Sequence, residues 1–219
     1  MNIEIKYIEN TNFLNKKEWE DMIHFLLKKI NDTLIGNLLI EDLKTHLINN
    51  KLTICNYSSV KSFQYPHYDY LKNIIYIPET PYFINVPVLP KEFKVFKSEV
   101  LINNIFNSKP LSDKIDHDFV NCFARYKFQP YYVILFHELV HCLRHLRYIN
   151  SNHEEESTIY GIKDNTLIIN EKIITENSFR KEVGLLPRLS HDSKDKYIYK
   201  ITEKKVDTKT LKEMFFLLR

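Results

Sequence analysis

Cysteine is scarce in this chain of 219 residues, and long apolar runs are missing from it. The three cysteines, Cys55, Cys122 and Cys142, are an odd number without C-x-x-C spacing, which argues against a disulfide framework and predicts a protein that works in a reducing cytosol. No run reaches the roughly 18 apolar residues of a membrane span, so we expect no membrane partner. No apolar signal segment follows Met1, so we also expect no cleavable signal peptide.

The chain also lacks a large excess of charge of one sign, because 31 basic and 28 acidic residues give a formal net charge of +3. This balance predicts no nucleic-acid partner. Hydrophobic residues make up 44% of the chain and charged residues 27%, which is typical of a globular protein. We expect one domain, 1–219, with an amino-terminal strand and helices (1–50), a central segment that carries the motifs (51–190) and a carboxyl-terminal strand and helix (191–219).

Both kinds of secondary structure are predicted, because some segments alternate apolar and polar residues and others repeat apolar residues every three or four positions. We expect strands at 2–9, 51–58, 73–79 and 197–202. We expect helices at 14–32, 40–50, 112–128, 131–148 and 208–219, a short buried helix at 157–161 and another between Thr175 and Gly184. The prolines of 80–110 indicate a loop with short strands. The mixture predicts an α+β fold.

Two histidines and a glutamate interrupt the apolar stretch YYVILFHELVHCLRHL at 131–146. Burying such side chains is costly unless something binds them. His137, Glu138 and His141 form an H-E-x-x-H motif. Residues four apart lie on the same face of a helix, so His137 and His141 point at one spot, as two ligands of a single Zn²⁺ require.

Glu138 lies about 100° round the helix from His137, beside the metal position rather than on it. There it can take a proton from a metal-bound water and later give it to a leaving amine, as a catalytic general base and acid. A chance match to so short a motif is the alternative, and the apolar flanks argue against it. His145 continues the four-residue spacing but has turned further round, so we expect it to be exposed or half-buried rather than a ligand.

A catalytic zinc needs a third protein ligand and one open position. The continuation H-E-x-x-H-x-x-G-x-x-H is absent, because arginines occupy positions 144 and 147. The third ligand must therefore come from a separate element. The candidates are the downstream carboxylates Glu154, Glu155, Glu156, Asp164, Glu171, Glu176 and Glu182. A solvated acidic loop is the alternative interpretation of the three consecutive glutamates.

Three ordered blocks, HELVH, EEESTIYG and TENSFRKEVGLLPR, resemble the NleD-like effector zinc metalloproteases, a family of bacterial type III secreted effectors. The resemblance is strongest over 131–188. It implies a compact zincin-like metalloprotease of the gluzincin type, with a central H-E-x-x-H helix and a small sheet with an edge strand. In that arrangement, both histidines of the motif and a glutamate on a second helix bind Zn²⁺.

The second block also resembles the E-E-x-x-T-F-G element of clostridial neurotoxin light chains. This likeness implies that Glu156, five residues before Gly161, is the third zinc ligand. Glu155 would then orient a histidine from outside the coordination sphere, and Glu154 is the fallback ligand.

Two arginines of the third block are candidate supporting residues. The resemblance implies that Arg180 pairs with Glu176 or with a carboxylate near the zinc, and that Arg188 does likewise. An ion pair that only stabilises a helix is the alternative for both. The aromatic residue that the family carries after the last arginine is missing, and His191 lies nearby instead.

The implied activity is that of a zinc-dependent endopeptidase and virulence effector. It would be secreted by a type III system and would cleave host signalling proteins, MAP kinases in particular, in the host cytosol. A chain that stays in the cytoplasm of its source, or one from a virus that acts directly in a host cytosol, is the alternative.

We expect the strand at 73–78 to line the edge of the cleft and to pair with an extended substrate. Tyr65, Tyr68, Tyr70 and Tyr82 are close to it in sequence, and loop packing is their simpler role. Two rival functions are a zinc hydrolase with a non-protein substrate and an inactive zincin-like binding module. The intact Glu138 weighs against the second.

Overall fold

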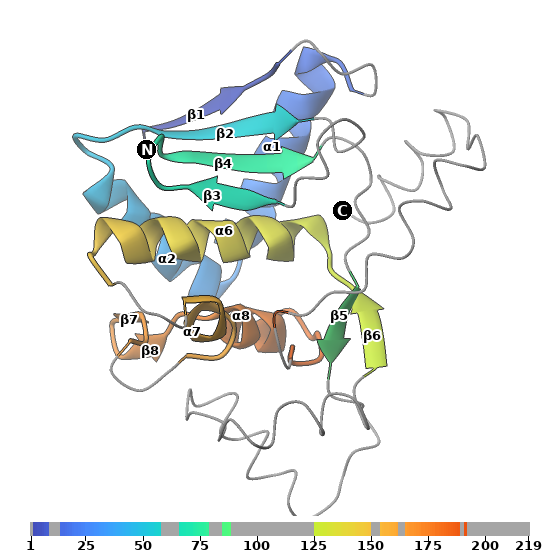
Figure 1. The fold of residues 1–219 in the computed structure, drawn as a ribbon, viewed down its shortest axis with the longest axis vertical. Coiled ribbons are helices and arrows are strands. Elements are labelled where there is room, and N and C mark those ends of the chain that lie inside the picture. The colour runs from blue at the N-terminus through green and yellow to red at the C-terminus, as the bar shows by residue number, and fades with distance from the viewer. Residues whose placement is uncertain are drawn as a thin grey trace, which may run out of the picture.

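The computed structural model describes residues 2–8, 14–57, 66–78, 85–88, 125–149, 154–161, 165–188 and 191. A four-stranded sheet has the order β1-β2-β4-β3 (Figure 1). Its parallel strands are β1 (Ile3–Lys6), β2 (Leu52–Tyr57) and β4 (Ile74–Pro78), which confirm the predicted strands at 2–9, 51–58 and 73–79. Together with the helices, this sheet confirms the α+β class.

The strand β3 (His67–Asp69) pairs antiparallel with β4 and forms one edge of the sheet. The prediction that the strand at 73–78 lines the edge is therefore wrong, because β4 lies between β2 and β3. A strand of three residues is too short for an alternating pattern to reveal. It forms through pairing with β4 across a tight turn, in which Asn73 adopts a φ of 54°.

Two helices join the parallel strands β1 and β2, which need a crossover connection. They are α1 (Lys16–Asn31) and α2 (Leu34–His46), and they confirm the two predicted amino-terminal helices. The second begins earlier than the predicted position 40, because Thr33 caps it. Gly36 permits a close approach of the two helices, since a Cβ atom there would lie 2.0 Å from the carbonyl oxygen of Ile30.

The helix α6 (Tyr131–Leu146) runs through the middle of the molecule and confirms the predicted helix at 131–148 (Figure 1). Pro130 precedes it with a φ of −62°, which suits the start of a helix. Every side chain from Tyr131 to Arg144 is buried. In Figure 1 the sheet lies above α6, α2 passes behind it and α7 (Glu154–Ile159) lies below it, and α1 also contacts it, so the helix is buried almost all round.

The helix α8 (Glu176–Glu182) packs against both α6 and α2. Its first residue, Glu176, faces α6. The carboxylate of its last residue, Glu182, accepts hydrogen bonds from the first backbone amides of α2, those of Leu34 and Ile35. A carboxylate is favourable at the positive end of a helix, so α8 fixes the position of α2 as well as that of α6.

Two small antiparallel ladders complete the described fold. One joins β5 (Asn85–Val88) to β6 (Arg125–Phe128), and the other joins β7 (Ile168–Ile169) to β8 (Lys172–Ile173). The predicted helix at 112–128 is wrong at 125–128, because pairing with a segment far away in sequence makes these residues a strand. The remainder of that prediction, the strand at 197–202 and the helix at 208–219 lie outside the described residues. None of the helices in the described part of the chain has the length and apolarity to cross a membrane.

Candidate metal centre

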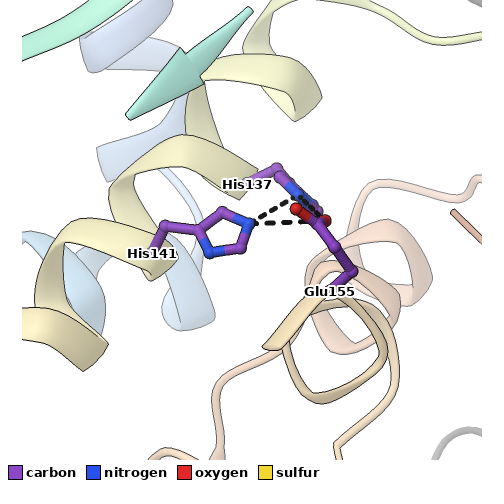
Figure 2. A group of neighbouring side chains, drawn as sticks. All are labelled: His137, His141 and Glu155. Atoms are coloured by element: carbon purple, nitrogen blue, oxygen red, sulfur yellow. Dashed lines mark hydrogen bonds and ion pairs between the residues drawn. The ribbon is translucent and has the colours of Figure 1, made fainter. Parts of the chain in front are cut away.

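Three side chains from two helices meet at one point. The Nε2 atoms of His137 and His141 lie 3.0 Å apart, and the Oε2 atom of Glu155 lies 3.1 Å from the first and 3.5 Å from the second (Figure 2). Tetrahedral Zn²⁺ with metal–ligand distances of about 2.0–2.1 Å holds its ligand atoms roughly 3.3 Å apart. The three atoms therefore have the spacing of a metal-binding group.

The short helix α7 presents its three glutamates in three different directions, because each residue of a helix is turned about 100° from the one before. Glu155 points at the two histidines, whereas Glu154 reaches the far side of the His141 ring. Glu156 does not belong to the metal-binding group, so the structure replaces the predicted third ligand by its neighbour. The burial of Ser157, Thr158 and Ile159 sets this register.

Each histidine is held from behind by a second carboxylate. The Nδ1 atom of His137 lies 2.9 Å from Oε2 of Glu176, and the Nδ1 atom of His141 lies 3.0 Å from Oε1 of Glu154. In the tautomer that a metal site needs, each Nδ1–H donates to its carboxylate and each Nε2 lone pair faces the centre. Glu154 and Glu176 thus perform the orienting role that had been predicted for Glu155.

Glu176 is the most heavily supported carboxylate of the site. It is fully buried and accepts hydrogen bonds from Gln129 Nε2 at 2.9 Å, Arg180 Nη1 at 3.1 Å and Arg188 Nη1 at 2.8 Å. The predicted pairing of Arg180 and Arg188 with Glu176 is therefore confirmed. Burial alone would raise the pKa of the Glu176 carboxyl, but Arg188, His137 and Arg180 hold it well below its usual range.

Gln129 is a supporting residue that the sequence did not indicate. Its side-chain oxygen accepts a hydrogen bond from Arg180, while its amide nitrogen donates to Glu176. A glutamine before Pro130 carries no motif, and only the packing of α8 beside the start of α6 brings it to the site. It keeps the Arg180 guanidinium and the Glu176 carboxylate aligned behind His137.

Glu138 is buried in the wall of a cavity of about 500 Å³ that opens beside the metal-binding group. Burial raises the pKa of the Glu138 carboxyl, and the charges of His137 and His141 oppose the rise. A carboxyl group whose pKa is raised above its usual value is better suited to accept and return protons than an ordinary one. Its place in the cavity wall, beside both histidines and apart from the metal-binding group, agrees with the position predicted for a general base.

When no metal is bound, the surrounding carboxylates favour the protonated form of both histidines. Burial tends to lower the pKa of His137, but the carboxylates of Glu155 and Glu176 outweigh it and raise this pKa to about 10. The pKa of His141 is also raised, since Glu154 and Glu155 outweigh the effect of burial. A metal ion must displace these protons, and its positive charge then takes their place among the carboxylates.

Three other histidines, His67, His145 and His191, line the cavity without belonging to the metal-binding group. The Nδ1 atom of His145 lies 3.1 Å from the Tyr68 hydroxyl, which agrees with the prediction that His145 is not a ligand. The Nε2 atom of His191 lies 3.4 Å from Oε2 of Glu155, on the rim of the cavity. Tyr68 and Tyr70 also line the cavity, whereas Tyr65 and Tyr82 lie outside the described residues.

A scan against protein-family models finds no match for this chain, and searches of curated proteins and of solved structures find none either. We therefore infer the chemistry of the centre from the residues that form it. Two imidazole nitrogens and one carboxylate oxygen surround one point, and a further carboxyl group lies beside it. Such a donor set suits Zn²⁺ and other first-row divalent ions, and three protein ligands leave a position open for water or substrate.

Proposed function

We propose that the protein is a zinc-dependent metalloendopeptidase with a zincin-like site. The observation that carries the proposal is the meeting of His137, His141 and Glu155 around one point, with the buried Glu138 in the wall of the same cavity. A purely structural zinc site is closed by four protein ligands, whereas the described residues supply three here, and the group opens into a cavity.

Zn²⁺ held by these residues would supply a Lewis acid and would make a water molecule more acidic. Glu138 would serve as the base that accepts a proton from water and as the acid that returns it to the leaving amine. Glu176 and Glu154 keep the two imidazoles in the metal-binding tautomer. Arg180 and Arg188 neutralise the negative charge of Glu176 in the interior, so that it stays ionised.

The position of the edge strand β3 favours a polypeptide as the substrate. His67 and Tyr68 of β3 line the cavity, and no strand among the described residues pairs with the outer side of β3. An extended segment that paired there would pass in front of Glu138 and the metal-binding group. This mode of binding selects for mobile, extended loops. The resemblance to NleD-like effectors supports host signalling proteins, MAP kinases among them, as substrates, and delivery into the host cytosol by a type III system.

The test is cleavage by the metal-loaded protein. Purified protein with one equivalent of zinc, measured by elemental analysis, is incubated with a lysate of host cells, and new protein termini are identified by mass spectrometry. We expect new termini that are absent with the variant Glu138→Gln, which keeps its zinc but loses the base.

The outcomes separate the rival functions. A zinc-loaded protein that produces no new termini contradicts the endopeptidase and leaves a hydrolase of a non-protein substrate. A cellular effect that survives Glu138→Gln points to a binding module instead.

A further inference from the structure

One end of the cavity is walled by aromatic rings. Tyr68 and Tyr70 come from β3 and the turn after it, and they lie over His145 at the carboxyl-terminal end of α6. The ring centroids of Tyr68 and Tyr70 are 5.9 Å and 5.8 Å from that of His145. The Tyr68 hydroxyl donates a hydrogen bond of 2.8 Å to Oδ1 of Asn73, which fixes the Tyr68 ring. Tyr70, by contrast, is 60% exposed and available for contact.

A carboxylate belongs to the same end of the cavity. Glu154 lines it and uses its Oε1 atom to hold His141, while its side chain remains 45% exposed. Glu154 and both tyrosines line the same cavity, and His141, which Glu154 holds, lies one helical turn before His145 on the same face of α6. A partly exposed negative charge therefore faces the same space as the aromatic wall.

The remaining lining favours a cation over an aliphatic group. Three of the described residues that line the cavity carry carboxylates, namely Glu138, Glu154 and Glu155. No lysine or arginine is among the described lining residues. Apart from Pro66, each of them carries a polar or ionisable side chain. A cation that lies over aromatic rings beside a carboxylate gains from both, whereas an aliphatic side chain would gain little from such a polar surface.

We propose that this end of the cavity, formed by Tyr68, Tyr70, His145 and Glu154, is a subsite for a lysine or arginine side chain of the substrate. The proposal rests on the proposed endopeptidase function and names its substrate preference. His145 lies one helical turn beyond His141, which is about 6 Å along the axis of α6. An extended peptide advances about 3.3 Å per residue, so the basic residue lies within about two residues of the scissile bond.

Peptide binding tests the subsite without any need for cleavage. Zinc-loaded Glu138→Gln protein is titrated calorimetrically with acetyl-Ala-Ala-Arg-Ala-Ala-amide and with the same peptide carrying norleucine in place of arginine. We expect the arginine peptide to bind about tenfold more tightly, from cation–π and carboxylate contacts of ordinary strength. Equal affinities would overturn the proposal.

Variants of Tyr70 assign the effect to the aromatic wall. In the Glu138→Gln background, Tyr70→Ala is expected to remove most of the preference for arginine, whereas Tyr70→Phe keeps it because the ring remains. Leu71→Ala is the matched control, since Leu71 is the next residue of the same turn and is 82% exposed. A preference that survives Tyr70→Ala unchanged would contradict the assignment.

The lysate experiment distinguishes failure of the subsite from failure of the proposed function. Cleavage sites rich in lysine or arginine within two residues of the cut, with the enrichment lost in Tyr70→Ala, support both. Cleavage without such enrichment keeps the endopeptidase and overturns the subsite. Preferential binding of the arginine peptide without any cleavage keeps the subsite and overturns the endopeptidase.

Discussion

The two halves of the metal centre perform the same task in opposite surroundings. Behind His137, Glu176 is 0% exposed and is held by two arginines and a glutamine. Behind His141, Glu154 is 45% exposed and comes from a short helix. The inner half is therefore part of the protein core, whereas the outer half is part of the cavity wall. A buried ion network is costly to break, and an exposed ion pair is not.

The largest effect is expected where the two halves meet, at Glu155. Replacing Glu155 with glutamine removes the carboxylate that contacts both histidines. We expect zinc affinity to fall by more than about 100-fold, which exceeds the loss expected when a residue that only orients a histidine is removed. Glu156→Gln is the matched control, with affinity expected to stay within about threefold of the unchanged protein. Competition with a chromophoric chelator measures both. A larger loss in Glu156→Gln would restore Glu156 as the ligand.

Breaking the inner half affects folding as well as zinc. Glu176→Gln leaves the guanidinium groups of Arg180 and Arg188 buried without a countercharge, so we expect the free energy of unfolding to fall by about 3–5 kcal/mol. Zinc affinity should fall by up to about 100-fold. Urea unfolding of the metal-free protein tests the first result, with Glu171→Gln as control, since Glu171 is an exposed glutamate in the turn between β7 and β8. A loss below about 1 kcal/mol would show that the network is not structural.

Raising the pH also weakens the inner half in the metal-free protein. The pKa of His137 is about 10 in the folded protein and ordinary, near 6.5, in the unfolded chain. Its contribution to stability is therefore complete below about pH 6.5 and is lost as the pH rises toward about 10. Thermal unfolding between these pH values should show a falling melting temperature. The fall should be smaller in His137→Asn, where only the raised pKa of His141 remains, and a melting temperature that rises in the unchanged protein would contradict the direction of the pKa shift.

The outer half should give the smallest change. Glu154→Gln keeps a hydrogen-bonding oxygen for His141 but removes a charge that is partly solvated. We expect zinc affinity to weaken by about tenfold or less and the free energy of unfolding to change by less than about 1 kcal/mol. The same chelator and urea measurements apply. An effect as large as that of Glu176→Gln would remove the distinction between the two halves.

Features that depend on neighbouring residues could be predicted from the sequence. The spacing of His137 and His141 within an apolar helix indicated two ligands on one face. Thr175 caps α8, and Gly184 follows it with a φ of 75°, as their residue types suggested. Such signals arise within one or two helical turns.

Features that depend on how distant segments of the chain pack together could not be predicted in the same way. The choice of Glu155 over Glu156 depends on how the six residues of α7 rest against α6, and three consecutive glutamates give no sign of it. The strands β3 and β6 exist because they pair with partners that a local pattern does not include. Gln129 reaches Glu176 through tertiary packing alone.

The position of α8 has a consequence for the division of the chain into parts. One end of this short helix orients a metal-binding imidazole, and its other end holds the first turn of α2 through Glu182. The amino-terminal segment therefore helps to hold the candidate metal centre in place. A fragment that began at residue 51 would leave the Glu182 carboxylate without its backbone partners and α6 without the helices that cover it, so we do not expect it to fold on its own.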